Sequence, residues 1–273
     1  MRCSRGKMMK VCSNIHTHTT WSDGANTVET VIRAAIEKGF HTIGISDHGY
    51  TAFDESYCMQ RGSEKAYKEE LQQLRERYAG QIDVLTGIEY EYAGEDPVPE
   101  VEYVVGSLHC LKIGSNYYSV DEDPPHFRQL LAAAGGELEL AKRYYDGVVE
   151  ATLRVRPDVL GHFDLLTKFS MVEETEAYRA VAKEALLAVL PAVKVVEVNT
   201  GAMARGLRAS PYPADFLLKA VRETGGSVIL SSDAHRVSHL DFAFEETLAR
   251  LRRLGFREVL ERRKEGFVPV SIG

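Results

Sequence analysis

The chain has 273 residues, of which 44% are hydrophobic and 27% charged, and its formal net charge at pH 7 is −7. This composition is typical of a globular protein that is large enough to bury a substantial core. The negative charge argues against a nucleic-acid partner held by bulk charge, and no apolar run is long enough to span a membrane.

The N-terminal segment, residues 1–12, is basic but lacks the apolar centre of a signal peptide. We expect a flexible extension there, followed by a single domain over residues 13–273. The cysteines form no CxxC pair and no dense framework, which is typical of a reducing compartment and predicts a cytoplasmic protein. Nothing in the sequence indicates an oligomeric state.

Apolar runs of strand length alternate with amphipathic stretches along the chain. The pattern predicts strands over residues 13–19, 42–47, 82–89, 101–109, 159–164, 195–199 and 227–233. It predicts helices over residues 27–39, 63–80, 137–158, 172–191 and 213–226. In the first helix, Thr27 is the expected N-cap and Gly39 the stop signal. Strands rich in Val and Ile that alternate with helices predict a parallel sheet covered by helices.

Two segments interrupt this rhythm, residues 91–100 and 111–125. Both are polar and rich in turn-forming residues, and both are long enough to be functional loops. No glycine-rich phosphate loop follows the first strand, so a nucleotide-binding doubly wound sheet is disfavoured.

Metal-binding residue types gather at the carboxyl ends of the predicted strands. These ends read IHTH, ISDHG, TGIEYE, GSLHC, GHFD, EVNTG and SSDAH. A lone histidine at such a position is more often structural, but the ends of parallel strands meet on one face of a barrel. Six of the nine histidines lie at these ends, next to three acidic residues: His16, His18, His48, His109, His162 and His235, with Asp23, Glu89 and Asp233.

His16 and His18 are two residues apart in a predicted strand, so their side chains should leave the same face. Imidazole and carboxylate groups without a cysteine thiolate favour zinc, manganese or iron over a structural cysteine-type zinc site. The sequence therefore predicts a centre for divalent transition metals.

The motifs HTHTTWSDG, SDHG, GIE, SLH, GHFD, EVNTG and SDAH, in this order, resemble those of the polymerase and histidinol phosphatase (PHP) superfamily over residues 14–239. The resemblance implies an α/β fold, a distorted (β/α)7 barrel of the PHP type, which holds two or three divalent ions. It implies that His16, His18, Glu89 and Asp233 hold a first ion. Glu89, His109 and His162 would hold a second, and Asp23, His48 and His235 a third.

Within the superfamily, the chain looks most similar to histidinol-phosphate phosphatases, through GIEYEY, GSLH, GHFDLLTKF and EVNTGAMARG. The resemblance implies that Arg205 and Lys168 contact phosphate, although Lys168 stands where an arginine is usual. Glu91 is a candidate for substrate contact. Asn199 could contact substrate or cap the following turn.

Asp164 follows His162 by two residues and should therefore share its face of the strand. It could protonate the leaving group, or it could orient a ligand histidine, and the sequence does not separate these roles.

These features predict a phosphomonoesterase that acts on a small phosphorylated metabolite with a metal-activated hydroxide as the nucleophile. The resemblance implies that the substrate is L-histidinol phosphate, in the penultimate step of histidine biosynthesis. One alternative is a PHP-type phosphatase for another small ester, such as a nucleotide or sugar phosphate. Another is a catalytically silent metal-binding module.

Overall fold

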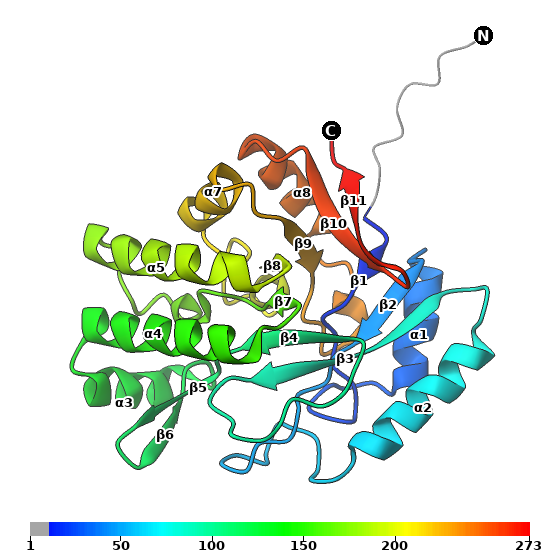
Figure 1. Cartoon of the computed structure of the whole chain (residues 1–273), viewed down its shortest axis with the longest axis horizontal. Helices are drawn as coiled ribbons and strands as arrows, with labels where there is room; N and C mark the ends of the chain where they lie inside the picture. The colour runs from blue at the N-terminus through cyan, green and yellow to red at the C-terminus, as the bar shows by residue number, and fades with distance from the viewer. Residues whose placement is uncertain (1–10) are drawn as a thin grey trace.

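The computed structural model describes residues 11–273. Within them, a nine-stranded sheet curls into a distorted barrel, with the strands in the order β1-β2-β3-β4-β7-β8-β9-β10-β11 (Figure 1). All neighbours pair in parallel except β10 and β11, which form an antiparallel hairpin. The strands are β1 (Ser13–Asn14), β2 (Thr42–Ile45), β3 (Asp83–Glu91), β4 (Tyr103–Ser107), β7 (Val159–Leu160), β8 (Val195–Asn199), β9 (Val228–Ser231), β10 (Glu258–Arg263) and β11 (Gly266–Ser271).

The chain beyond β1 closes the ring against the chain beyond β9. Thr17 and Ala234 form a parallel bridge, and the backbone N–H of His18 donates to the carbonyl of Ala234 at 3.0 Å. The seven parallel strands of the expected (β/α)7 barrel are therefore present. The barrel is distorted because β3 passes to β4 without a helix and because β10 and β11 extend the sheet.

Helices cover the outer face of the sheet (Figure 1). Five of them match the predicted helices, namely α1 (Val28–Glu37), α2 (Glu64–Arg77), α4 (Glu137–Val155), α5 (Glu176–Val189) and α7 (Asp215–Glu223). Thr27 caps α1 as expected, because its hydroxyl accepts the backbone N–H of Thr30. The sequence pattern did not predict α3 (Pro124–Ala134), α6 (Gly201–Ala204) or α8 (Phe244–Arg253).

The segment over residues 111–125 is more ordered than the loop that its composition predicts. It contributes to a separate hairpin of β5 (Cys110–Ile113) and β6 (Asn116–Ser119), followed by the first turn of α3. Asp123 caps α3 by accepting the backbone N–H of His126 at 2.8 Å. This hairpin borders the pocket described below.

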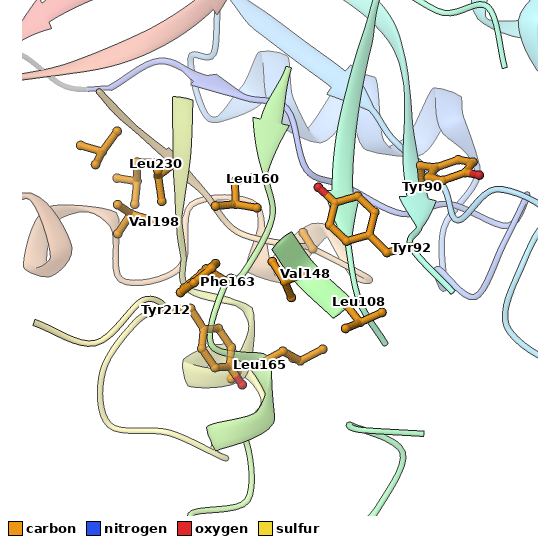
Figure 2. Packing of buried hydrophobic residues seen from close by; sticks show 14 of the residues in the cluster. Tyr90, Tyr92, Leu108, Val148, Leu160, Phe163, Leu165, Val198, Tyr212 and Leu230 are labelled. Atoms are coloured by element: carbon orange, nitrogen blue, oxygen red, sulfur yellow. The ribbon is translucent and has the colours of Figure 1, made fainter. Parts of the chain in front are cut away.

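Alternation along the strands separates two cores. On β8, Val196 and Val198 face outward into the large core between sheet and helices, whereas Val195 faces the barrel interior. Figure 2 shows part of the outer core, in which Leu160 of β7 and Leu230 of β9 lie in the same cluster as Val198.

The interior core lies mainly near the amino ends of the parallel strands. It consists of Ile15, Leu85, Tyr103, Val105, Val159, Val195 and Ile229. Gly44 and Gly87 leave room for the Tyr103 ring, since a Cβ at either position would lie 2.2 Å from a Tyr103 atom. Two residues further toward the carboxyl ends of β4, β8 and β9, the buried side chains are polar instead: Ser107, Glu197 and Ser231. The apolar layer thus forms the floor of a polar site.

Of the predicted N-terminal extension, residues 1–10 lie outside the described residues. Val11 and Cys12 do not belong to an extension. Val11 is 1% exposed in the outer core, and the backbone N–H of Cys12 donates to Glu261 Oε1 at 2.7 Å. Between residues 11 and 273, none of the helices combines the length and the apolar character that crossing a membrane requires.

Candidate metal centre

The nine predicted ligand residues converge at the carboxyl ends of the parallel strands. They border or underlie a cavity of about 370 Å³, whose lining includes Asp23, His48, His109, His162, Asp233 and His235. His16, His18 and Glu89 lie beneath it and are at most 1% exposed. Strand β1 ends at Asn14, so His16 and His18 follow the strand rather than lie within it as predicted. They nevertheless reach the same cluster.

A first group lies at the bottom of this cavity, around Glu89 Oε2. This oxygen lies 3.2 Å from His16 Nε2 and 3.4 Å from His18 Nε2. Asp233 Oδ1 lies 3.2 Å from His18 Nε2 and 3.8 Å from His16 Nε2. The first ligand set that the resemblance implies is therefore brought together.

A second group surrounds the other oxygen of the same carboxylate. Glu89 Oε1 lies 3.0 Å from His162 Nε2 and 3.4 Å from His109 Nε2, and the two imidazole nitrogens are 3.2 Å apart. An ion about 2.0–2.1 Å from tetrahedral ligands spaces them about 3.3 Å apart, so this triangle has the dimensions of a metal site. Glu89 can thus bridge two ions.

A third group lies nearer the surface, at the loop that carries Asp23. Asp23 Oδ2 lies 3.1 Å from His235 Nε2, and Oδ1 lies 3.9 Å from His48 Nε2. His18 Nδ1 also faces Asp23 Oδ1, at 3.8 Å, and completes a set of four. His48 Nδ1, in contrast, lies 3.0 Å from Glu89 Oε2, so His48 stands between the first and third groups.

The hydrogen bonding around these groups is incomplete. His16 Nε2, both ring nitrogens of His18 and Glu89 Oε2 are buried without a hydrogen-bond partner. Leaving a buried polar atom unsatisfied costs about 1–3 kcal/mol, so four in one cluster require compensation. A cation at the centre of each group would supply it, and the nitrogen and oxygen donors suit a divalent transition metal. The residues present fit such ions.

Electrostatics keep the carboxylates ready to bind a cation. Burial alone would raise the pKa of Glu89, but His16, His48 and His109 hold it well below its usual range. Asp233 behaves in the same way, because Arg205 and His16 lower its pKa against the effect of burial. Both side chains are ionised at neutral pH.

Glu91 does not have the substrate-facing position that the sequence predicted. Its side chain is 4% exposed and does not line the cavity. Glu91 Oε2 accepts both the backbone N–H of His109, at 2.9 Å, and its ring Nδ1–H, at 2.8 Å. Although burial lowers the pKa of His109, Glu89 and Glu91 raise it to about 10. Through these two contacts Glu91 orients the His109 ring so that its Nε2 faces the second group.

Glu197 is a residue that sequence reasoning missed. It lies on β8, two residues after Val195, and is fully buried. Its Oε1 lies 2.5 Å from Nδ1 of His16. Despite burial, His16 lowers the pKa of Glu197, so the ionised carboxylate accepts the proton of Nδ1. The available signal was a single charged residue among the three valines of the strand VVEVN.

Asp164 and Asn199 are not brought to the cavity. The alternation that should have aligned Asp164 with His162 fails because β7 ends at Leu160. The Asp164 carboxylate is fully buried and accepts the backbone N–H of Ala214 at 2.9 Å, so it does not face a leaving group. Asn199 Oδ1 accepts the N–H of Gly201 at 2.8 Å, which is the capping role.

The two predicted phosphate-binding residues both line the cavity. Arg205 Nη2 lies 3.2 Å from Asp233 Oδ2, and Nη1 lies 3.4 Å from His235 Nδ1. Lys168 Nζ donates to the carbonyl and to Oδ2 of Asp121, at 2.7 and 2.8 Å. Lys168 is 8% exposed, so it is not a solvated surface charge.

Comparisons with known proteins identify relatives of this chain. The sequence profile of the PHP domain matches residues 14–201. The histidinol-phosphatase of Bacillus subtilis is 25% identical over 268 residues, which cover 89% of this chain and 100% of that protein. The probable histidinol-phosphatase of Deinococcus radiodurans is 29% identical over 272 residues, covering 94% of this chain and 99% of that one.

Among solved structures, the histidinol phosphate phosphatase of Lactococcus lactis, complexed with zinc, L-histidinol and phosphate, superposes with a TM-score of 0.70 at 18% identity. It covers 94% of this chain and 98% of that one. A histidinol phosphatase structure from Listeria monocytogenes has a TM-score of 0.73 at 21% identity, covering 86% and 99%. At these identities the structural likeness shows a shared fold.

Proposed function

The chain belongs to the PHP domain family and is a metal-dependent phosphatase, and we propose that it hydrolyses L-histidinol phosphate to L-histidinol and phosphate. One observation carries the proposal. The carboxylate of Glu89 points its two oxygens at two separate groups of imidazole nitrogens, at the bottom of a cavity that also holds Arg205 and Lys168. Two closely spaced cation sites beside basic side chains suit a phosphate ester.

We assign the ligands as two or three sets for zinc, manganese or iron. The first ion takes His16, His18, Glu89 and Asp233, and the second takes Glu89, His109 and His162. Asp23, His48 and His235 would hold a third. When bound, such ions activate water at neutral pH and stabilise charge on phosphoryl oxygens.

Arg205 and Lys168 have donors left for the phosphate. Two of the three N–H groups of Lys168 serve Asp121, which leaves one for a phosphoryl oxygen. Asp121 thereby fixes the lysine beside the cavity, and Lys168 lowers the pKa of Asp121 to about 2 despite burial. Arg205 uses one N–H toward Asp233 and keeps others for the substrate. Arg205 and Lys168 can therefore both hold the phosphoryl group next to the proposed metal sites.

The lining of the cavity also suits an alcohol that carries a positive charge. It includes the carboxylates Asp54 and Glu122 and the hydroxyl-bearing residues Ser56, Tyr57 and Ser119. L-histidinol phosphate carries an ammonium group on the carbon next to its phosphorylated CH₂ and an imidazole at the end opposite its phosphate. The carboxylates of Asp54 and Glu122 can pair with these groups, whereas a nucleotide or sugar phosphate offers no ammonium there.

A substrate panel tests the proposal. Metal-replete protein would be assayed for phosphate release from L-histidinol phosphate, a nucleoside monophosphate, a sugar phosphate and a generic aryl phosphate. We expect kcat/KM to be highest for L-histidinol phosphate. A higher value for the nucleotide or the sugar phosphate would identify a phosphatase for another small ester. No turnover of any member would identify a silent metal-binding module.

A further inference from the structure

We propose that Glu197 is a positioning residue that ties the first and second metal sites together, an inference that rests on the metal assignment above. Its carboxylate contacts a ligand of each site. Oε1 lies 2.5 Å from His16 Nδ1, and Oε2 accepts the backbone N–H of His162 at 2.7 Å. His16 belongs to the first ligand set and His162 to the second.

The contact with His16 fixes the tautomer of that ring. An ionised carboxylate can only accept, so Nδ1 of His16 must carry a proton. A cation that displaced the second proton of the ring would then find a lone pair on Nε2, the atom that faces Glu89 and Asp233. Outer carboxylates of this kind set the orientation of metal-binding histidines and increase their basicity.

The contact with His162 acts through the backbone instead of the ring. Strand β7 ends at Leu160, so no sheet ladder holds the peptide of His162. Glu197 Oε2 supplies the acceptor that this N–H would otherwise lack. A buried charge on β8 thereby positions a side chain that extends from the neighbouring strand.

The carboxylate of Glu197 is itself held in place by two further donors. Ser231 donates to Oε1 at 2.5 Å, and Nδ2 of Asn199 donates to Oε2 at 3.0 Å. Each oxygen therefore accepts two hydrogen bonds in a fully buried position. If this carboxylate moved to stay in contact with His16, it would lose its contact with His162, and the reverse also holds. This is the physical basis for coupling between the two metal sites.

Glu91 provides a contrast, because it serves one site only. Both of its contacts with a ligand go to His109 of the second site. Glu261 provides a matched control outside the centre. It is a buried glutamate on β10 whose Oε2 lies 2.8 Å from Nε2 of a histidine, His41, that belongs to none of the metal sets.

The decisive variant is Glu197→Gln. Glutamine keeps the shape but offers one acceptor oxygen where two are needed. Whichever way the amide turns, either the His16 side or the His162 side meets an NH₂ group instead of an acceptor. We expect zinc affinity at the affected site to fall about 10–100-fold in a chelator competition assay. Glu91→Gln should weaken the second ion alone, and Glu261→Gln should weaken neither.

A measurement on the wild-type protein keeps the proposal testable if Glu197→Gln does not fold. In ¹⁵N-histidine NMR spectra of the zinc-loaded chain, His16 should carry its proton on Nδ1 in a signal protected from solvent exchange. A His16 protonated on Nε2 with a bare Nδ1, or a folded Glu197→Gln that binds both ions within twofold of the wild type, would overturn the proposal. A wild-type chain that binds no zinc would instead contradict the proposed function.

Discussion

Glu91 accepts two hydrogen bonds from His109 through one oxygen, one from its backbone and one from its ring. These two hydrogen bonds fix both the backbone and the ring of His109, and together they set the direction in which His109 Nε2 points. Glu91 stands two residues after Glu89 on β3, and the inward face of that strand therefore carries both the proposed bridging carboxylate and the carboxylate that orients His109.

The first prediction follows from this pair. Glu91→Gln should lower phosphatase activity about 10–100-fold by weakening the second metal site, with little change in KM once metal is saturating. Activity measured as a function of added zinc or manganese would check it. If KM for the substrate rose while the metal dependence stayed unchanged, Glu91 would instead be the substrate contact that the sequence indicated.

A second prediction concerns Glu89. Glu89→Gln preserves the shape but removes the charge that both groups of imidazoles share, so we expect activity to fall by about a hundredfold or more. Elemental analysis should show a loss of bound metal in the same variant. Near-normal turnover with a full metal complement would show that this residue does not bridge two ions.

Metal removal gives a third prediction. We expect at least two transition-metal ions per chain, because the first and second groups both have metal-site dimensions. Chelation should abolish activity, and manganese or zinc should restore it. The single tryptophan, Trp21, lies between His18 and Asp23 in the sequence, and its indole N–H donates to Glu70 at 2.6 Å. Because it is so close in the chain to two proposed ligands, its fluorescence should change on chelation. Elemental analysis that finds less than one ion after metal-replete purification would contradict the assignment.

The sequence predicted where the candidate metal centre lies, but it did not predict the hydrogen bonds that hold the ligand side chains in place. Convergence of strand ends follows from the parallel βα rhythm alone, and the grouping of the ligands came from the resemblance to the PHP superfamily. The partner of His16, however, is Glu197, which is 181 residues away in the chain. Which oxygen meets which nitrogen across that distance depends on the curvature of the sheet and on side-chain packing, and neither is encoded in local spacing.

Strand boundaries explain the errors at Asp164 and at the first histidines. The rule of alternation holds only inside a strand, and β1 and β7 each contain two residues. His16 and His18 lie beyond β1, yet the bridge between Thr17 and Ala234 restores a local extended geometry. After β7 the chain turns instead into a 3₁₀ segment, Leu165–Thr167, and this turn directs Asp164 away from the cavity.

A fourth prediction concerns the pH dependence of stability, at a glutamate away from the centre. Burial raises the pKa of Glu261, but hydrogen bonds from His41 and the backbone of Cys12 outweigh it and hold the pKa below the ordinary value of 4.5. A lowered folded-state pKa adds stability above the unfolded-state pKa, and this stability is lost as the pH falls through the folded-state value.

Glu261→Gln should therefore lower the free energy of unfolding by about 1–3 kcal/mol at neutral pH, through the loss of buried charged contacts. The difference between wild type and variant should shrink as the pH falls below about 4.5. Denaturant titrations between pH 3 and 7 would measure it. A difference that grew toward acidic pH would mean that this carboxylate is not ionised in the folded state.

The last prediction separates phosphate binding from the structure of the loop after β8. Arg205 lines the cavity, whereas Arg208 does not; its guanidinium lies over the Tyr212 ring, 4.4 Å from the centroid, and contacts Thr167. Arg205→Ala should lower kcat/KM by about 30–1000-fold, or about 2–4 kcal/mol, because charge on the phosphoryl oxygens is redistributed during transfer. Arg208→Ala should lower the Tm while leaving kcat/KM within a few-fold of the wild type.

Arg205 also contacts Asp233, a proposed ligand, so its loss could act through the metal rather than through phosphate. Measurements at saturating zinc separate the two routes. If Arg205 holds phosphate, the defect persists when both ions are bound, and Arg205→Lys recovers part of the loss because an ammonium still neutralises phosphate without the planar fork. If added zinc restored the wild-type rate of Arg205→Ala, the arginine would serve to hold Asp233, and Lys168 would be the protein's cationic contact with the phosphoryl group.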